Sequence, residues 1–146
     1  MKARTVGNLL EGKGYELYSV QGEDTVLSAL REMADRNIGA LLVFDGEELV
    51  GVITERDCAR KLDLMGRSAR STRVDQVMER QVATIRSSAT IEESLRVMTE
   101  LRMRHLPVVD DELVGLISIG DVGKAMIVSQ EHLIDDLTGY ITGSPR

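Results

Sequence analysis

The clearest hydrophobic pattern in the chain is a short apolar run that occurs twice and ends each time in a hydroxyl residue. The first copy spans 49–57 (LVGVITERD) and the second spans 113–121 (LVGLISIGD). An apolar, β-branched run of this length predicts a buried strand. The hydroxyl residue is a typical helix N-cap, and the Asp three positions later falls in the first helical turn. Each copy therefore predicts a strand leading directly into a helix, whose free N–H groups favour an anionic ligand.

The elements around the two copies recur in the same order. Apolar residues at helical spacing predict helices beginning at Thr25 and Thr90, and Asp45-Gly46 predicts a hairpin turn. Matching residues lie 65 positions apart, or 64 towards the end of the unit, as with Thr25 and Thr90. The pattern predicts a β-α-β-β-α unit that occurs twice. The strands are expected at 17–20, 40–44, 49–53, 81–85, 106–109 and 113–117.

The expected fold is α/β, of the α+β type, with two tandem β-α-β-β-α repeats. A unit of roughly 55–60 residues is only marginally stable alone, because it buries a small fraction of its surface. We therefore expect the repeats to pack as a pseudo-two-fold pair, with N-terminal and C-terminal helical extensions. The expected divisions are a helical leader at 1–14, repeats at 15–66 and 76–128, a linker at 67–75, and a C-terminal amphipathic helix and tail at 129–146. That last helix either covers the core or packs on a second subunit.

Charge and composition narrow the classes of partner. The formal net charge of −6 argues against general binding to nucleic acid or to an anionic membrane. No apolar run is long enough to span a bilayer and no secretion signal is visible, so we expect a cytoplasmic protein. Basic residues are concentrated between Arg56 and Arg73, where they either face phosphates or form a solvated helix end and linker.

The doubled unit, with its Leu-Val-Gly-x-Ile-[Thr/Ser]-x-x-Asp ending, resembles a tandem CBS-domain pair, the Bateman module. Two further segments carry the resemblance, 37–43 (NIGALLV) and 104–110 (RHLPVVD). It covers roughly residues 17–127. The chain looks like the stand-alone bacterial proteins that consist of one CBS pair.

The resemblance implies that adenine nucleotides bind in clefts between the repeats. AMP, ADP or ATP are the first expectation, and NAD(H) or S-adenosylmethionine the next. The family pattern places ribose contacts at Asp57 and Asp121. It places phosphate contacts at Thr54, Ser118, Arg56, Arg104 and His105. The adenine is expected against the strand edges at Ser19, Val20, Ala40, Leu41, Ala83, Thr84, Ile85, Leu106 and Pro107.

The same residues also have a structural interpretation. A Ser/Thr-x-x-Asp spacing is that of a helix capping box, so the alternative is an interaction scaffold with no ligand. We expect no enzyme, because no catalytic constellation is visible, and no metal site, because the two His residues are far apart. Cys58 is expected to be buried packing. The resemblance further implies a homodimer that acts on a separate effector protein.

Overall fold

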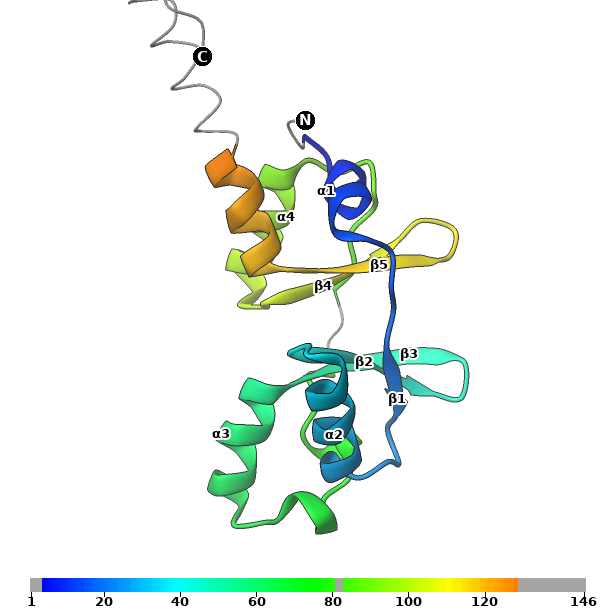
Figure 1. Cartoon of the computed structure of the whole chain (residues 1–146), viewed down its shortest axis with the longest axis vertical. Helices are drawn as coiled ribbons and strands as arrows, with labels where there is room; N and C mark the ends of the chain where they lie inside the picture. The colour runs from blue at the N-terminus through cyan, green and yellow to red at the C-terminus, as the bar shows by residue number, and fades with distance from the viewer. Residues whose placement is uncertain (1–3, 81–82, 129–146) are drawn as a thin grey trace, which may run out of the picture. The chain divides into compact units, whose positions relative to one another are not determined.

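The computed structural model describes residues 4–80 and 83–128. The predicted C-terminal helix at 129–146 lies outside these ranges. The chain divides into two compact units (Figure 1). The first-repeat unit is Glu16–Ala83, and the second-repeat unit combines Met1–Tyr15 with Thr84–Arg146. None of the described helices is long and apolar enough to cross a membrane.

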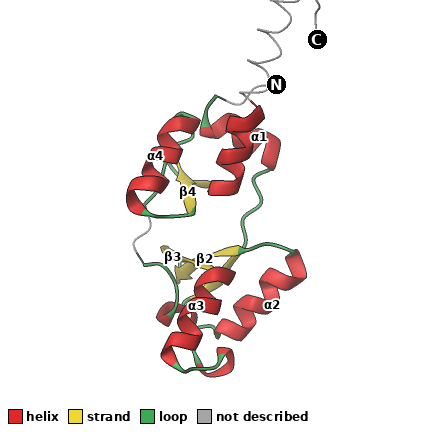
Figure 2. Cartoon of the chain, turned by 90° about the vertical axis from the view of Figure 1, so that its left-hand side faces the viewer, coloured by secondary structure: helices red, strands yellow, loops and turns green. Residues whose placement is uncertain are grey.

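The first-repeat unit has a three-stranded sheet with its two α-helices on one face (Figure 2). Strand β1 runs parallel to β2, and β2 runs antiparallel to β3, in the order β1-β2-β3. Gly46, at φ 64°, makes the turn of the predicted hairpin. The elements are β1 (Ser19–Gln21), α2 (Val26–Arg36), β2 (Ala40–Asp45), β3 (Glu48–Thr54), α3 (Glu55–Met65), and two 3-10 turns at Ala69–Ser71 and Val74–Gln76.

The second-repeat unit has the corresponding hairpin, but its first strand is reduced. Of the strand predicted at 81–85, residues 83–85 are described, and only Ile85 pairs, as an isolated bridge to Val108. Pro107 stands where the first repeat has Leu42, and proline has no N–H to extend the ladder. The elements are α1 (Val6–Lys13), α4 (Ile91–Leu101), β4 (His105–Val109), β5 (Leu113–Ser118), and a helix described over 119–128.

The predicted helix starts are confirmed. The side chains of Thr25 and Thr90 each accept a hydrogen bond from the backbone N–H three residues later, at 3.1 and 3.0 Å. Both helices end at a residue in the left-handed conformation, Asn37 and Arg102, each at φ 55°. This conformation stops the helix and satisfies its last carbonyl groups.

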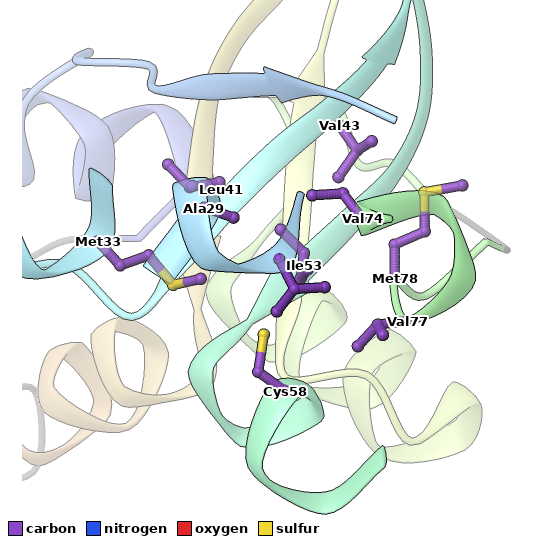
Figure 3. Close-up of a cluster of buried hydrophobic side chains, with 10 residues drawn as sticks. Ala29, Met33, Leu41, Val43, Ile53, Cys58, Val74, Val77 and Met78 are labelled. Carbon is purple, nitrogen blue, oxygen red and sulfur yellow. The ribbon is translucent and has the colours of Figure 1, made fainter. Parts of the chain in front are cut away.

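The core of the first-repeat unit includes residues from the predicted linker and the start of the predicted second repeat. Val74, Val77 and Met78 are buried against Ile53 and Cys58 (Figure 3). The segment thus contributes three side chains to the core that α2, α3 and the sheet form. Remaining members of this buried cluster are Val26, Ala29, Met33, Leu41 and Val43.

Helix α1 adds buried side chains to the second-repeat unit, as the segment 74–78 does to the first-repeat unit. The sequence TVGNLL at 5–10 matches RVDQVM at 73–78, with an offset of 68 residues. In both segments the N–H of the first residue donates to the side-chain oxygen three positions later, from Thr5 to Asn8 Oδ1 (3.2 Å) and from Arg73 to Gln76 Oε1 (3.0 Å). Their backbone hydrogen bonds correspond pairwise: Val6 N to Ala89 O (2.9 Å) with Val74 N to Asp24 O (2.8 Å), and Gly7 N to Ser87 O (2.9 Å) with Asp75 N to Gly22 O (2.9 Å).

The two core-completing segments, 74–79 and α1, each lie in close contact with the glycine of one apolar run. A Cβ added at Gly51 would lie 2.6 Å from the carbonyl oxygen of Glu79 and 2.7 Å from the sulfur of Met78. A Cβ added at Gly115 would lie 2.7 Å from a methyl carbon of Leu10. The two glycines therefore permit the close approach of the segments that complete each core.

We predict that Gly51→Ala destabilises the protein more than Gly115→Ala. The first substitution forces a methyl group against fixed backbone, while the second meets the flexible end of a leucine. The expected cost is about 1–3 kcal/mol for Gly51→Ala and less for Gly115→Ala. Urea denaturation of the two variants and the wild type measures both. Equal losses, or a larger loss at Gly115, would contradict this account of the packing.

Candidate functional site

The hydroxyl–carboxylate motif occupies the same place in both units, at a junction between strand and helix. Thr54 ends β3, and its hydroxyl oxygen accepts a hydrogen bond of 3.0 Å from the backbone N–H of Asp57. Ser118 ends β5, and its hydroxyl oxygen accepts one of 3.0 Å from the N–H of Asp121. Both motifs therefore cap helices as predicted, which places each carboxylate in the first helical turn.

In the second-repeat unit, several predicted phosphate-binding residues come together around this junction. His105 opens β4 and lies opposite Ser118 in the antiparallel ladder. The carbonyl oxygen of Arg104 accepts a hydrogen bond of 2.8 Å from the N–H of Ile119. Arg104 is exposed and His105 is half-buried. The strand pairing thus brings a hydroxyl, an imidazole and a guanidinium-bearing residue to one end of the hairpin.

The first-repeat unit has the same geometry with different chemistry. Ala40 lies opposite Thr54, and the carbonyl oxygen of Gly39 accepts a hydrogen bond of 3.0 Å from the N–H of Glu55. Arg56 follows in the first turn of α3 and is exposed. Small residues here replace the Arg104-His105 pair, so the two junctions offer different space and charge.

The predicted adenine contacts divide according to burial. The side chains of Leu41 and Leu106 are fully buried in the cores, which leaves only their main-chain atoms to meet a ligand. Ser19 and Thr84 are exposed. The others are intermediate or buried: Val20 and Ala83 are half-buried, and Ala40, Ile85 and Pro107 are buried.

Comparisons with known proteins decide the family. The CBS-domain model matches residues 14–64 and 74–128. In an alignment of 155 positions, the chain is 35% identical to the mitochondrial CBS domain-containing protein CBSX3 of Arabidopsis thaliana. The alignment covers 97% of this chain and 74% of that protein. The chain belongs to the CBS-domain family. Its two repeats form a CBS pair, a regulatory module of the signal-transduction type.

Solved structures of bacterial CBS proteins share this fold. A signal-transduction protein with CBS domains from Burkholderia ambifaria is 45% identical and superposes with a TM-score of 0.81, covering 86% of this chain and 96% of that one. The CBS-domain protein ATU1752 of Agrobacterium tumefaciens is 31% identical with a TM-score of 0.79, covering 86% and 95%. The family and fold expected from the sequence are therefore confirmed.

The two CBS repeats differ in what holds the carboxylate. In the first repeat, the Asp57 carboxylate has no hydrogen bond or ion pair with any residue that the structure describes, and it is half-buried. In the second, Oδ2 of Asp121 accepts hydrogen bonds from the N–H of Ser118 (2.9 Å) and from Nζ of Lys13 (2.6 Å). Only the second repeat thus has the complete capping box, and it adds an ion pair.

Lys13 is the residue at this junction that the sequence analysis missed. It is the last residue of α1, and its Nζ also donates to the carbonyl oxygen of Leu116 at 2.6 Å. Lys13 and Asp121 are 108 positions apart, so no local pattern connects them. The available signal was the match of 5–10 with 73–78, which assigns α1 to the second repeat.

Opposing effects set the pKa of Asp121. Partial burial raises it, but the hydrogen bonds from Lys13 and from the Ser118 backbone outweigh burial and hold the pKa below the ordinary value of 3.8. The carboxylate is therefore charged throughout the neutral range. A charged acceptor forms stronger hydrogen bonds than a neutral one.

The basic residues between Arg56 and Arg73 do not form one continuous cluster of free charges, because some of them have partners within the protein. Nζ of Lys61 donates to the carbonyl oxygen of Val77 at 2.8 Å, and Arg73 pairs with Asp75 at 2.7 Å. Arg56, Arg60 and Arg70 stay exposed.

In the part of the chain that the structure describes, no group of three or more His, Cys, Asp or Glu residues could hold a metal ion.

We predict a pH-dependent contribution of Asp121 to stability. Because its folded pKa lies below the ordinary value of 3.8, the contribution is present above that pH and is lost as the pH falls through the lower folded value. The wild type should exceed Asp121→Asn by up to about 1 kcal/mol at pH 7 for this partly exposed pair. Urea denaturation between pH 7 and pH 3 should show the gap narrowing on acidification. A gap that stays constant would contradict the prediction.

Cys58 is predicted to be unreactive while the protein is folded. Burial, with the charge of Asp57, raises the pKa of its thiol from 9.0 to about 11, so the thiolate population falls about a hundredfold. A thiol-specific chromogenic reagent at pH 8 should react at least that much more slowly with folded protein than with protein in concentrated urea. Comparable rates in both would show that the thiol is accessible.

Proposed function

We propose that this CBS pair is a non-catalytic regulatory protein that binds adenine nucleotides through its two hydroxyl–carboxylate motifs. The observation that carries the proposal is the Asp57 carboxylate, held beside a helix start and engaged by none of the described residues. AMP, ADP and ATP are the first ligands, followed by NAD(H) and S-adenosylmethionine.

The chemistry of each junction suits a nucleotide. A carboxylate accepts hydrogen bonds from two neighbouring ribose hydroxyls, and charge strengthens both bonds. The helix start supplies N–H groups and the positive end of the dipole for a phosphate. Arg56 in the first repeat, and Arg104 with His105 in the second, add cationic or hydrogen-bonding side chains near the same place.

Ligand binding is proposed to act by shifting populations. A nucleotide that prefers one arrangement of the pair, or of a dimer of pairs, stabilises that arrangement by its difference in affinity. The regulated effector is then a separate protein, and the proposed location is the cytoplasm. This part of the proposal requires a dimer, which light scattering at micromolar concentration tests.

A second candidate is an interaction scaffold without a ligand. The complete capping box at Ser118 and Asp121 favours it, because that carboxylate already has protein partners. In this case the motif stabilises a helix start and has no further role. The incomplete box at Asp57 favours nucleotide binding instead.

We predict that AMP, ATP or NAD raises the thermal stability of the wild type. A ligand at a hundred times its dissociation constant adds about 2.7 kcal/mol. Asp57→Ala should remove one binding event and Asp121→Ala the other, in calorimetric titrations. Asp63→Ala is the matched control, because Asp63 is an exposed acid on the same α3 helix.

Two results would favour the scaffold. One is a wild type whose melting temperature is unaffected by all three nucleotides. The other is a pair of Asp variants that lose stability, as lost caps do, while the nucleotide response stays at the wild-type level.

A further inference from the structure

The ammonium group of Lys13 lies beside the Asp121 carboxylate, and not all of its N–H donors have a partner among the described residues. An ammonium group has three donors, and the described residues occupy two of them, through Leu116 and Asp121. On Asp121, both hydrogen bonds fall on Oδ2, and Oδ1 accepts none from any described residue. One donor and one carboxylate oxygen thus remain next to each other.

A vicinal diol is complementary to this pair. One ribose hydroxyl donates to the carboxylate oxygen, and the oxygen of the neighbouring hydroxyl accepts from the ammonium. Both bonds involve a charged partner, which makes them stronger than bonds between neutral groups. We propose that Lys13 is a ligand-binding residue of the second CBS repeat and, with Asp121, binds the two ribose hydroxyls. This rests on the proposed function.

The side chains of Lys13 and Asp121 are both partly exposed to solvent, as a ligand-binding site requires. The Lys13 side chain is 37% exposed and that of Asp121 is 27% exposed. Neither side chain is closed off from solvent, so a ligand can approach the two groups while the ion pair stays intact. The existing bonds hold both groups in place, which lowers the entropy lost when a ligand binds.

The first repeat binds a diol differently under this proposal. In the sequence match of 5–14 with 73–82, Lys13 corresponds to Gln81, which lies outside the described residues. The carboxylate at Asp57 has both oxygens unengaged by described residues, so it can receive both hydroxyls itself. The repeats should therefore differ in their response to loss of one hydroxyl.

The test uses the full chain carrying Asp57→Ala, which leaves the second site to be measured alone. Calorimetry compares AMP, 2′-deoxy-AMP, 3′-deoxy-AMP and adenosine. AMP should bind about tenfold more tightly than either deoxy analogue. Adding Lys13→Met should weaken AMP about tenfold and abolish the preference over the one analogue that lacks the hydroxyl bound by Lys13. Lys124→Met is the matched control, since Lys124 is an exposed lysine in the same unit, and it should change neither.

Three results would overturn the inference. The first is AMP affinity and diol preference that survive Lys13→Met. The second is a loss for AMP with none for adenosine, which would assign Lys13 to the phosphate. The third is an Asp57→Ala protein that binds no AMP while the wild type does. If the wild type itself binds no nucleotide, the proposed function fails instead.

A measurement on the unaltered chain keeps the inference testable if Lys13→Met does not fold. Reductive methylation followed by mass spectrometry reports the reactivity of each lysine. Saturating AMP should slow the labelling of Lys13 at least tenfold and leave that of Lys124 unchanged. Equal labelling of Lys13 with and without AMP would show that the ligand does not contact it.

Discussion

Burial of apolar side chains from a segment outside each hairpin completes the core of each unit. Val74, Val77 and Met78 pack into the first-repeat unit, and Val6, Leu9 and Leu10 are buried in the second. A repeat of this size is only marginally stable by itself, and the added segment increases the apolar area that it buries. Gly51 and Gly115 allow the segments to approach, because any side chain there would occupy their place.

The position of the candidate site depends on this packing. The strand that carries each glycine leads directly into the cap and then into the carboxylate. In the second-repeat unit, the inserted helix also brings Lys13 to the end of the strand, within hydrogen-bond distance of Leu116 and Asp121. The element that completes the hydrophobic core therefore also changes the chemistry of the junction.

The duplication consequently produces two junctions with the same backbone and different side chains. In the first, an unengaged carboxylate stands beside small residues at Gly39 and Ala40. In the second, a carboxylate with a lowered pKa stands beside a lysine, Arg104 and His105. Under the proposed function, such a pair binds two ligands of one class with different selectivity.

Local periodicity in the amino-acid sequence was sufficient to predict several features of the protein. These are the strand–cap–helix junctions, the helix starts at Thr25 and Thr90, the hairpins, and the family through its repeated motifs. Of the strand predicted at 81–85, the described residues 83–85 form only one bridge, at Ile85. Pro107 on the neighbouring strand β4 has no backbone N–H to donate. Only the tertiary structure showed that 74–78 and α1 complete the two cores. It also showed that Lys13 meets Asp121. Contacts across 108 positions are set by the packing of whole elements, which no local pattern encodes.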